Sequence, residues 1–328
     1  MDYSKLFEDY RIKVENSLDS LVTQKEPVSL YEPIRYVLDG GGKRIRPILT
    51  LFTCEALGAP PEPAFNAAIA IEVLHNFTLV HDDIMDNADT RRGRMTVHKK
   101  WDRDVAILSG DQLVGIAYNK LLKTNSLRIR EIMDVFTNGI LEVCEGQGLD
   151  KEFEFRKEVS IDEYLKMIEK KTSKLLETCT VIGALIADAG GEQINAVRNY
   201  AKNLGLAFQI QDDLLDIFAD EKKFGKKTGG DIAEGKKTYL LLKAAELVTG
   251  KNDRESIKKI LNKEPGIGEK DFILNIQRIY EEYGIFDESK KAIENFTLEA
   301  DKSLELISTG GGREMLKWFS AMLLNRNY

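Results

Sequence analysis

The sequence predicts an all-α fold, on two observations. Apolar residues recur at steps of three and four, as do Phe65, Ala68 and Ile69 in the stretch 65–81, and this spacing places them on one face of a helix. Strand-like alternation of β-branched residues is almost absent. The same helical period is found in residues 103–123, 160–188, 192–219 and 237–248.

Start and stop signals bound these predicted helices. Ser160 followed by Glu163 has the spacing of a capping box, in which each side chain binds the other residue's backbone N–H. The pair Gly190-Gly191 is predicted to end one helix, with the next beginning near Glu192. The charged runs 151–158 and 250–271 are interpreted as solvated connections and surface helices.

The chain is predicted to form a single domain, residues 1–328. Its length alone would allow two domains. However, it holds only seven prolines and no stretch rich in Pro, Ser or Gln that could serve as a linker. With 43% hydrophobic residues, one large core is expected.

Composition excludes several classes of protein. A net charge of −7 argues against nucleic acid as a partner, since phosphate binding normally needs a basic surplus. The three cysteines, Cys54, Cys144 and Cys179, lack metal or redox spacing and are interpreted as buried apolar thiols in a reducing compartment. The N-terminus is polar and no uninterrupted apolar run reaches about 18 residues, so we expect a cytoplasmic protein that does not span a membrane.

Two acidic clusters stand out from this background. Asp82-Asp83-Ile84-Met85-Asp86 and Asp212-Asp213-Leu214-Leu215-Asp216 both have the form DDxxD. At average composition, roughly 7% of chains of this length contain one such pattern by chance and about 0.2% contain two. Both clusters follow apolar helical segments. The pair is therefore informative where one copy would not be.

The clusters suit a hard cation. Residues four apart share a helix face, so Asp82 should point with Asp86, and Asp212 with Asp216. Carboxylates within one turn repel each other, more so beside apolar residues, and a bound cation would offset that repulsion. Magnesium takes oxygen ligands, water and substrate phosphates. By charge balance the six carboxylates match three Mg²⁺ ions and would leave them able to hold a diphosphate. The alternative is two solvated acidic helix ends.

Basic residues accompany the clusters, although each feature alone has an ordinary explanation. Gly40–Pro47 joins three glycines to Lys43 and Arg46, which could bind phosphate, but a glycine turn before a basic helix is common. The pair Arg91-Arg92 would usually be a solvated helix end, and a lone histidine such as His75 is more often a satisfied core residue. A loop rich in glycine and lysine follows the second cluster and is typical of loops that close over phosphates; it includes Lys226 and Lys236.

With these motifs the chain resembles the trans-type prenyl diphosphate synthases, also called polyprenyl synthetases. The resemblance covers about residues 35 to 240. It rests on GGGKRIRP at 40–47, HNFTLVHDDIMD at 75–86, RRG at 91–93, KT at 171–172, FQIQDDLLD at 208–216, GK at 225–226 and GKKT at 235–238. It implies a single-domain helical bundle around a central cavity, the type I isoprenoid synthase fold, usually as a homodimer, with the two DDxxD helices facing each other at the cavity mouth.

The resemblance also implies a role for each site residue. Magnesium would be bound by Asp82 and Asp86 with Asp83 close by, and by Asp212 supported by Asp213 and Asp216. The allylic diphosphate would be contacted by Arg91, Lys171, Gln209, Lys226 and Lys236, and the isopentenyl diphosphate by Lys43, Arg46, His75 and Arg92. Thr172 and Gln209 would direct oxygen dipoles at the allylic carbon, so Arg91, Lys171, Thr172 and Gln209 are the predicted catalytic residues. The implied reaction is a head-to-tail (1′-4) condensation.

Product length depends on the residues before the first cluster. Phe77 lies five residues before Asp82, about 7.5 Å along a helix, where its ring could form the floor of the cavity. The alternative is an ordinary core phenylalanine. Within the family, an aromatic residue here followed by the small Thr78 is most similar to geranylgeranyl (C20) synthases. Farnesyl (C15) synthase is the alternative, and longer products are less favoured.

Three rival functions fit the sequence less well. A class I terpene cyclase should have Asn, Ser and Glu ligands at its second metal site and needs no second diphosphate site. A catalytically inactive regulatory subunit would usually lose one acidic cluster, and both are intact here. A plain cation-binding helical protein leaves the adjoining basic loops unexplained.

Overall fold

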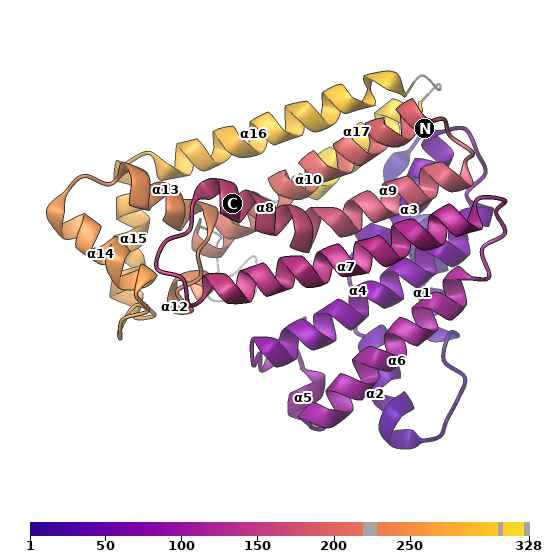
Figure 1. Cartoon of the computed structure of the whole chain (residues 1–328), viewed down its shortest axis with the longest axis horizontal. Helices are drawn as coiled ribbons and strands as arrows, with labels where there is room; N and C mark the ends of the chain where they lie inside the picture. Colours follow the sequence, from indigo (N-terminus) through magenta and orange to yellow (C-terminus); the bar gives the residue numbers. More distant parts are fainter. Residues whose placement is uncertain (219–227, 308–310, 325–328) are drawn as a thin grey trace. The chain divides into compact units, whose positions relative to one another are not determined.

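The computed structural model describes residues 1–218, 228–307 and 311–324. Within these ranges the regular structure is helical apart from one short hairpin, in which β1 (Thr90–Arg91) pairs antiparallel with β2 (Arg94–Met95). Figure 1 shows this all-α architecture, which confirms the predicted class. The hairpin was not predicted: Arg91 lies in strand β1 and Arg92-Gly93 form the turn, where a helix end was expected. The expectation that the cysteines are buried is confirmed for Cys54 and Cys179 but is wrong for Cys144, which is exposed.

The helices follow one another along the chain with short connections. From the N-terminus they are α1 (Tyr3–Asp19), α2 (Val28–Leu38), α3 (Ile45–Ala56), η1 (Glu62–Ala64), α4 (Phe65–Met85), α5 (Val97–Lys100), α6 (Arg103–Leu121) and α7 (Ile129–Phe153). These are followed by α8 (Ile161–Ile168), the π-helical turn η2 (Glu169–Ser173), α9 (Lys174–Ile186), α10 (Gly191–Phe218), α12 (Gly230–Ala233) and α13 (Tyr239–Leu247). The last are α14 (Lys251–Leu261), α15 (Lys270–Glu282), α16 (Ile285–Ser303), η3 (Leu304–Leu306) and α17 (Gly312–Leu324).

The chain divides into two compact units. The first unit comprises Met1–Thr137, Thr178–Asn195 and Ile307–Leu316. The second comprises Asn138–Glu177, Ala196–Leu306 and Lys317–Tyr328. Four of the five dividing points fall inside α7, α9, α10 and α17, and the fifth directly follows η3. The single domain 1–328 therefore stays a prediction.

In the first unit, α4 is the core helix. Its buried residues are almost all apolar and cover most of its circumference from Ala67 to Val80. α6 packs along it, as Figure 1 shows. The buried positions of α6 include the small residues Ala106, Gly110 and Ala117, which let the two helices approach closely.

The same helix bears on the membrane question. Among the described residues, the stretch Glu62–Met85 is long and apolar enough by composition to cross a bilayer. However, 61% of the 18-residue window that passes this test is buried inside the structure, and the core helix of a globular protein passes the same test of length and composition. This one stretch is weak evidence for a membrane span.

In the second unit, α8, η2 and the first residues of α9, up to Glu177, follow one another without a break. The predicted capping box is present at the start of α8: Ser160 Oγ accepts from the Glu163 N–H at 3.2 Å, and Glu163 Oε2 accepts from the Ser160 N–H at 2.9 Å. The π-helical turn then packs against two glycines from other helices. Gly146 on α7 meets the backbone of Lys171, and Gly205 on α10 meets Ser173. A side chain at either glycine would overlap the turn.

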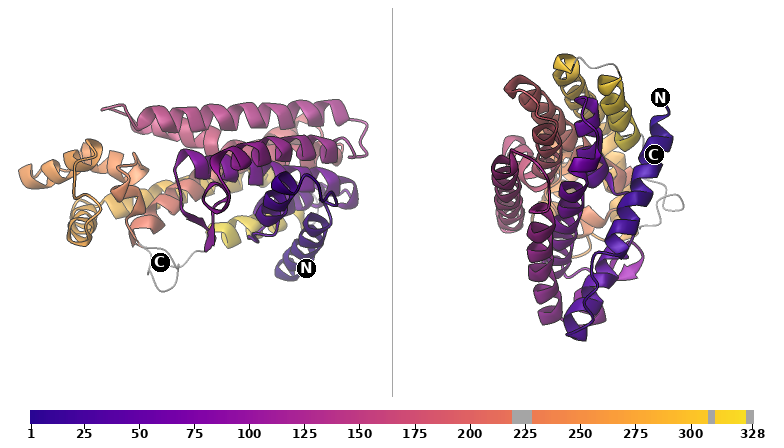
Figure 2. Two further views of the ribbon diagram at one scale, coloured as in Figure 1. Left: turned by 90° about the horizontal axis from the view of Figure 1, so that it is seen from below. Right: turned by 90° about the vertical axis from the view of Figure 1, so that its right-hand side faces the viewer.

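The apolar core of the second unit lies among α8, α10, α13, α15 and α16. Leu214, Leu240, Ile276 and Ile285 are all fully buried there. α14 and α15, drawn in orange, pack beside each other in this unit (Figures 1 and 2). The charged run 250–271 thus contains a surface helix, as expected, whose apolar side buries Ile257 and Ile260.

Candidate active site

The first acidic cluster lies at the C-terminal end of α4. Asp82 and Asp83 belong to the last turn, and Asp86 is the C-cap residue. Asp82 is half-buried, Asp83 is buried and Asp86 is exposed. The C-terminal end of a helix carries partial negative charge, so carboxylates are unfavourable there unless a cation is near. This placement makes the end of α4 suitable for a bound cation.

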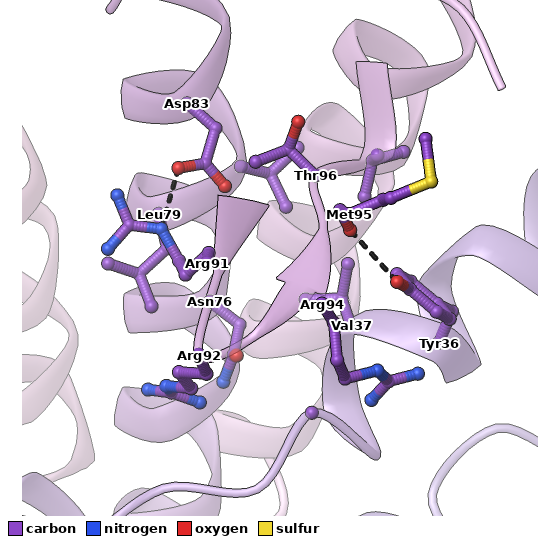
Figure 3. A pocket seen from close by; sticks show the side chains of 13 residues that line it. Tyr36, Val37, Asn76, Leu79, Asp83, Arg91, Arg92, Arg94, Met95 and Thr96 are labelled. Carbon is purple, nitrogen blue, oxygen red and sulfur yellow. Dashed lines mark hydrogen bonds and ion pairs between the residues drawn. The ribbon is translucent and has the colours of Figure 1, made fainter. Parts of the chain in front are cut away.

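Asp83 has a protein partner on the hairpin. Arg91 Nε donates to Asp83 Oδ1 at 2.6 Å (Figure 3). Burial raises the pKa of Asp83 despite this guanidinium and despite the hydrogen bond it donates. The pair fixes the hairpin against α4 and brings Arg91 beside the acidic cluster.

The Arg92 side chain contacts the glycine run at residues 40–42. Arg92 has a positive φ of 54° at the tip of the hairpin, and its Nη1 donates to the carbonyl of Gly41. Gly42, with φ of 137°, lies against the same guanidinium, and a side chain at Gly42 would come within 2.9 Å of Arg92 Cζ. The glycine run is thus needed for close approach to an arginine as well as for the turn itself.

A pocket opens between the hairpin, α2 and α4 (Figure 3). It is lined by Tyr36, Val37, Gly40, Asn76, Leu79, Val80, Asp83, Arg91, Arg92, Arg94, Met95, Thr96 and Val97. Its arginines give it a positive side, and Leu79 and Val80 give it an apolar one. Such a lining suits a small molecule with an anionic head and a hydrocarbon tail.

Arg94 and Tyr36 were not predicted as site residues. The Arg94 guanidinium stacks on the Tyr36 ring, with Cζ 3.9 Å from the ring centroid, and Tyr36 Oη donates to the Met95 carbonyl at 2.9 Å. Only the place of Arg94 directly after Arg91-Arg92-Gly93 could have indicated it from the sequence. Its position in the lining follows from the hairpin, which the sequence did not predict.

His75 and Arg46 meet at the start of α3. Arg46 Nη1 lies 3.1 Å from His75 Nε2. Burial, and then the cations of Arg46 and Arg92, hold the pKa of His75 well below its ordinary value. The ring is therefore neutral and can accept from Arg46. A satisfied core histidine would make such a contact too, so the assignment of His75 to a substrate site stays a prediction.

An ion-pair network around the buried Arg44 stabilises the start of α3, next to Arg46. Arg44 has a left-handed backbone and a side chain with no exposed surface. It donates to Glu15 at 2.9 Å, to Glu72 at 2.7 Å and to the Leu38 carbonyl at 2.9 Å. The network links α1, α2, α3 and α4, and so fixes the loop that carries the exposed Lys43.

The second acidic cluster lies near the C-terminal end of α10, in the second unit. Asp212 is half-buried, whereas Asp213 is only 3% exposed. Three protein donors bind the Asp213 carboxylate: Tyr164 Oη at 2.6 Å, Gln209 Nε2 at 3.1 Å and the Tyr239 N–H at 3.1 Å. Burial, reinforced by Asp231, raises the pKa of Asp213 to about 7.

Asp216 holds the start of a short helix. Its Oδ2 accepts from the Asp231 N–H at 2.9 Å, and its carbonyl accepts from the Gly229 N–H at 2.7 Å. Burial raises the pKa of Asp216 to about 6. Lys236 lies beyond that helix, with Nζ 3.5 Å from Asp231 Oδ1, whose charge raises the pKa of the lysine. Lys226 falls outside the described residues.

The π-helical turn presents Lys171 and Thr172. Lys171 Nζ lies 2.6 Å from Asp150 Oδ2, and Thr172 Oγ1 donates to Gln209 Oε1 at 2.9 Å. Burial tends to raise the pKa of Asp150, but Lys171 and then Lys236 outweigh it, so the pKa is lowered. π-Helical turns occur often at functional sites. The predicted residues Lys171, Thr172, Gln209 and Asp213 are thus brought together.

The donors present fit magnesium. In the part of the chain that the structure describes, no group of three or more His, Cys, Asp or Glu side chains lies close enough to hold a metal ion. Mg²⁺ usually binds through one or two carboxylates and completes its shell with water and substrate phosphates.

Comparisons with known proteins decide the family. The sequence pattern of the polyprenyl synthetase family matches residues 27–276. The chain belongs to the polyprenyl synthetase family. It is 35% identical over 329 residues to the short chain isoprenyl diphosphate synthase of Methanothermobacter thermautotrophicus, with 100% of both chains covered. It is 44% identical over 235 residues to the geranylgeranyl diphosphate synthase of Methanosarcina mazei, covering 71% of this chain and 72% of that one.

Solved structures of polyprenyl synthetases agree. The fold matches that of the geranylgeranyl pyrophosphate synthetase from Pyrococcus horikoshii with a TM-score of 0.92 and 34% identity, over 100% of both chains. The protein is therefore a prenyltransferase of the polyprenyl synthetase family. Enzymes of this family use isopentenyl and allylic diphosphates and generally depend on magnesium.

Proposed function

We propose that the protein is a geranylgeranyl diphosphate synthase, which condenses isopentenyl diphosphate head-to-tail (1′-4) with allylic diphosphates. The observation that carries this proposal is the group of Arg46, His75 and Arg92 beside the first acidic cluster. An enzyme that only ionises one diphosphate does not need a second anion site. A condensing enzyme does, because each of its substrates carries a diphosphate.

We propose that the acidic clusters bind the magnesium ions. Asp82, Asp86 and Asp212 would be direct ligands, with Asp83, Asp213 and Asp216 in support, and three ions are expected from the charge balance. Bound magnesium supplies positive charge that neutralises the departing diphosphate. The saturated carboxylate of Asp213 and the backbone contacts of Asp216 support the division into ligands and supporting residues.

Cationic side chains would hold the two diphosphates. We propose that the allylic diphosphate is bound by Arg91, Lys171, Gln209, Lys226 and Lys236, and the isopentenyl diphosphate by Lys43, Arg46, His75 and Arg92. Arg92 supports the second assignment, because its guanidinium lies against the glycine run that precedes Lys43. A neutral His75 would accept from Arg46 and so hold that guanidinium in place beside the proposed phosphate site.

Thr172 and Gln209 would stabilise the allylic carbocation. The Thr172 hydroxyl hydrogen is directed to Gln209 Oε1, so the lone pairs of Thr172 Oγ1 point elsewhere and can face positive charge. Preorganised dipoles of this kind need no rearrangement when charge develops. The isopentenyl double bond then attacks the cation, and a proton is lost, which we assign to the departing diphosphate.

Product length is proposed to depend on Phe77 and Thr78. The Phe77 ring contacts His81 edge-on, with ring centroids 4.7 Å apart, one turn before Asp82. A ring held in this way would limit the chain to twenty carbons, while Thr78 leaves more room than a second aromatic residue would. Farnesyl diphosphate, with fifteen carbons, is the alternative product.

We propose that the enzyme is a homodimer in the cytoplasm. The outer face of α6 exposes Ile107 at 38% and Leu108 at 58%, and Leu122 at its end at 61%. A second copy of the chain would cover such a face. Multi-angle light scattering of the purified protein should give twice the chain mass of 37.1 kDa. A monomer at micromolar concentration would contradict this assignment.

One assay tests the proposed function. The purified protein is incubated with magnesium, labelled isopentenyl diphosphate and, in turn, dimethylallyl, geranyl or farnesyl diphosphate, and the products are separated by chain length. We expect a C20 product from each primer. Absence of any condensation product would remove the proposed function, whereas a C15 product would support the farnesyl alternative.

A further inference from the structure

Four side chains of the second unit form one directed hydrogen-bond chain that includes Asp213 of the second acidic cluster. They are Tyr164, Asp213, Gln209 and Thr172. α8 supplies Tyr164, η2 supplies Thr172, and α10 supplies Gln209 and Asp213. The order of donors and acceptors along this chain determines which atoms Gln209 and Thr172 can offer to a substrate.

The direction begins at Asp213. Both oxygens of the Asp213 carboxylate accept hydrogen bonds, and Gln209 turns its amide nitrogen toward Oδ1, 3.1 Å away. The amide oxygen of Gln209 then points the other way and accepts from Thr172 Oγ1 at 2.9 Å. A flipped amide would set oxygen against oxygen at Asp213. The carboxylate thus selects one of two amide orientations.

Tyr164 provides a hydrogen bond to the other oxygen of the Asp213 carboxylate. Its hydroxyl donates to Asp213 Oδ2 at 2.6 Å, the shortest of the three bonds to that carboxylate, and its side chain is 2% exposed. Burial and the nearby Asp213 raise the pKa of this phenol well above its ordinary value, so it stays a donor. A charge-assisted bond of this length is among the stronger ones in proteins.

We propose that Tyr164 is a positioning residue for the condensation: through Asp213 it fixes the amide orientation of Gln209 and hence the direction of the Thr172 hydroxyl. The inference rests on the proposed function for its catalytic consequence. Tyr164 does not contact the reacting atoms in this scheme. Losing its hydroxyl leaves the buried Asp213 carboxylate short of a donor, which lets Asp213 and Gln209 shift.

The kinetic test uses Tyr164→Phe, with Tyr200→Phe as the matched control. Tyr200 is also fully buried and binds Ser320 Oγ at 2.9 Å, but it lies nine residues before Gln209 on α10. We expect kcat of Tyr164→Phe to fall about tenfold or more, with KM for both diphosphates changed less than about twofold. Tyr200→Phe should keep the wild-type kcat. A wild-type kcat in Tyr164→Phe would overturn the inference.

A double-mutant cycle tests whether Tyr164 acts through Gln209. If it does, Tyr164→Phe combined with Gln209→Ala should be no slower than Gln209→Ala alone. Independent effects that multiply would overturn the inference. Gln209→Glu leaves Tyr164 intact but places an acceptor opposite Asp213, so it should also lose kcat. A wild-type kcat in this variant would contradict the argument from bond direction even if Tyr164→Phe did not fold.

A readout without turnover separates this inference from the proposed function. With glutamine side chains labelled by ¹⁵N, the Gln209 amide resonances, assigned through Gln209→Ala, should shift in Tyr164→Phe and remain unchanged in Tyr200→Phe. Unshifted resonances in a folded Tyr164→Phe protein would overturn the positioning role, whatever reaction the enzyme catalyses. Conversely, a wild-type protein that forms no prenyl product would remove the proposed function while leaving the observed shift in place.

Discussion

Gly110 of α6 lies directly against the imidazole ring of His81 on α4, so a methyl group at position 110 would overlap that ring. We predict that Gly110→Ala destabilises the protein by about 1–3 kcal/mol, the usual cost of overpacking, although alanine is the better helix former. Gly190→Ala is the control, because a methyl group there meets nothing within 4 Å. Urea unfolding followed by circular dichroism measures both. Equal midpoints would show that α6 can shift to make room.

Phe77 should limit the length of the product. Its half-buried ring contacts His81 one turn before the acidic cluster, so Phe77→Ala would remove the obstacle and lengthen the prenyl chain by one or more five-carbon units. Chromatography of the products, compared with Phe155→Ala at an exposed position, tests this. An unchanged chain length in Phe77→Ala would leave Phe77 as an ordinary core residue.

Arg44 should be essential for stability. Its side chain has no exposed surface and its partner Glu72 only 2%, so Arg44→Met would leave a buried carboxylate without its cation. Removing one partner of a buried pair typically costs about 3–5 kcal/mol. Arg278→Met breaks the exposed pairs with Asp253 and Glu282 and should leave the melting temperature nearly unchanged. Similar midpoints for the two variants would contradict this difference in cost.

His75 should make stability depend on pH. Because its folded pKa is depressed, the unfolded chain takes up a proton below about pH 6.5 that the folded protein does not, and stability falls as the pH is lowered. The slope from this one group is at most about 1.4 kcal/mol per pH unit. Urea unfolding between pH 7 and 5 should show a shallower loss in His75→Gln than in the wild type. Parallel profiles would contradict the depressed pKa.

The acidic clusters should be needed for turnover but not for folding. Asp82→Ala and Asp212→Ala are each predicted to lose orders of magnitude in kcat, while circular dichroism stays as in the wild type. EDTA should abolish wild-type activity, and magnesium should restore it. Glu255→Ala, at an exposed position on α14, serves as the control. Near-normal rates in both aspartate variants would refute the metal assignment.

The helices and the acidic clusters could be predicted from the sequence because they depend on local pattern. The period of 192–219 predicted α10, and DDxxD placed its carboxylates one turn apart. The family followed from the same motifs. These features need no knowledge of distant parts of the chain.

What the sequence did not predict depends on partners brought together by folding. The hairpin at Arg91 is held by Asp83 and carries Arg94 to Tyr36, and the π-helical turn is held by Gly146 and Gly205. No local pattern marks these contacts. Likewise, the resemblance implied that Asp213 supports Asp212, but only the folded chain shows that the donors of Tyr164, Gln209 and Tyr239 converge on Asp213.

The Tyr164–Asp213 bond has an evolutionary consequence. A phenol hydroxyl and a carboxylate that satisfy each other inside a core are each a burden without the other. Across related sequences, the alignment columns of these two residues should therefore change together or not at all. Lineages that replace the second aspartate of this motif are the ones in which the tyrosine is expected to be lost.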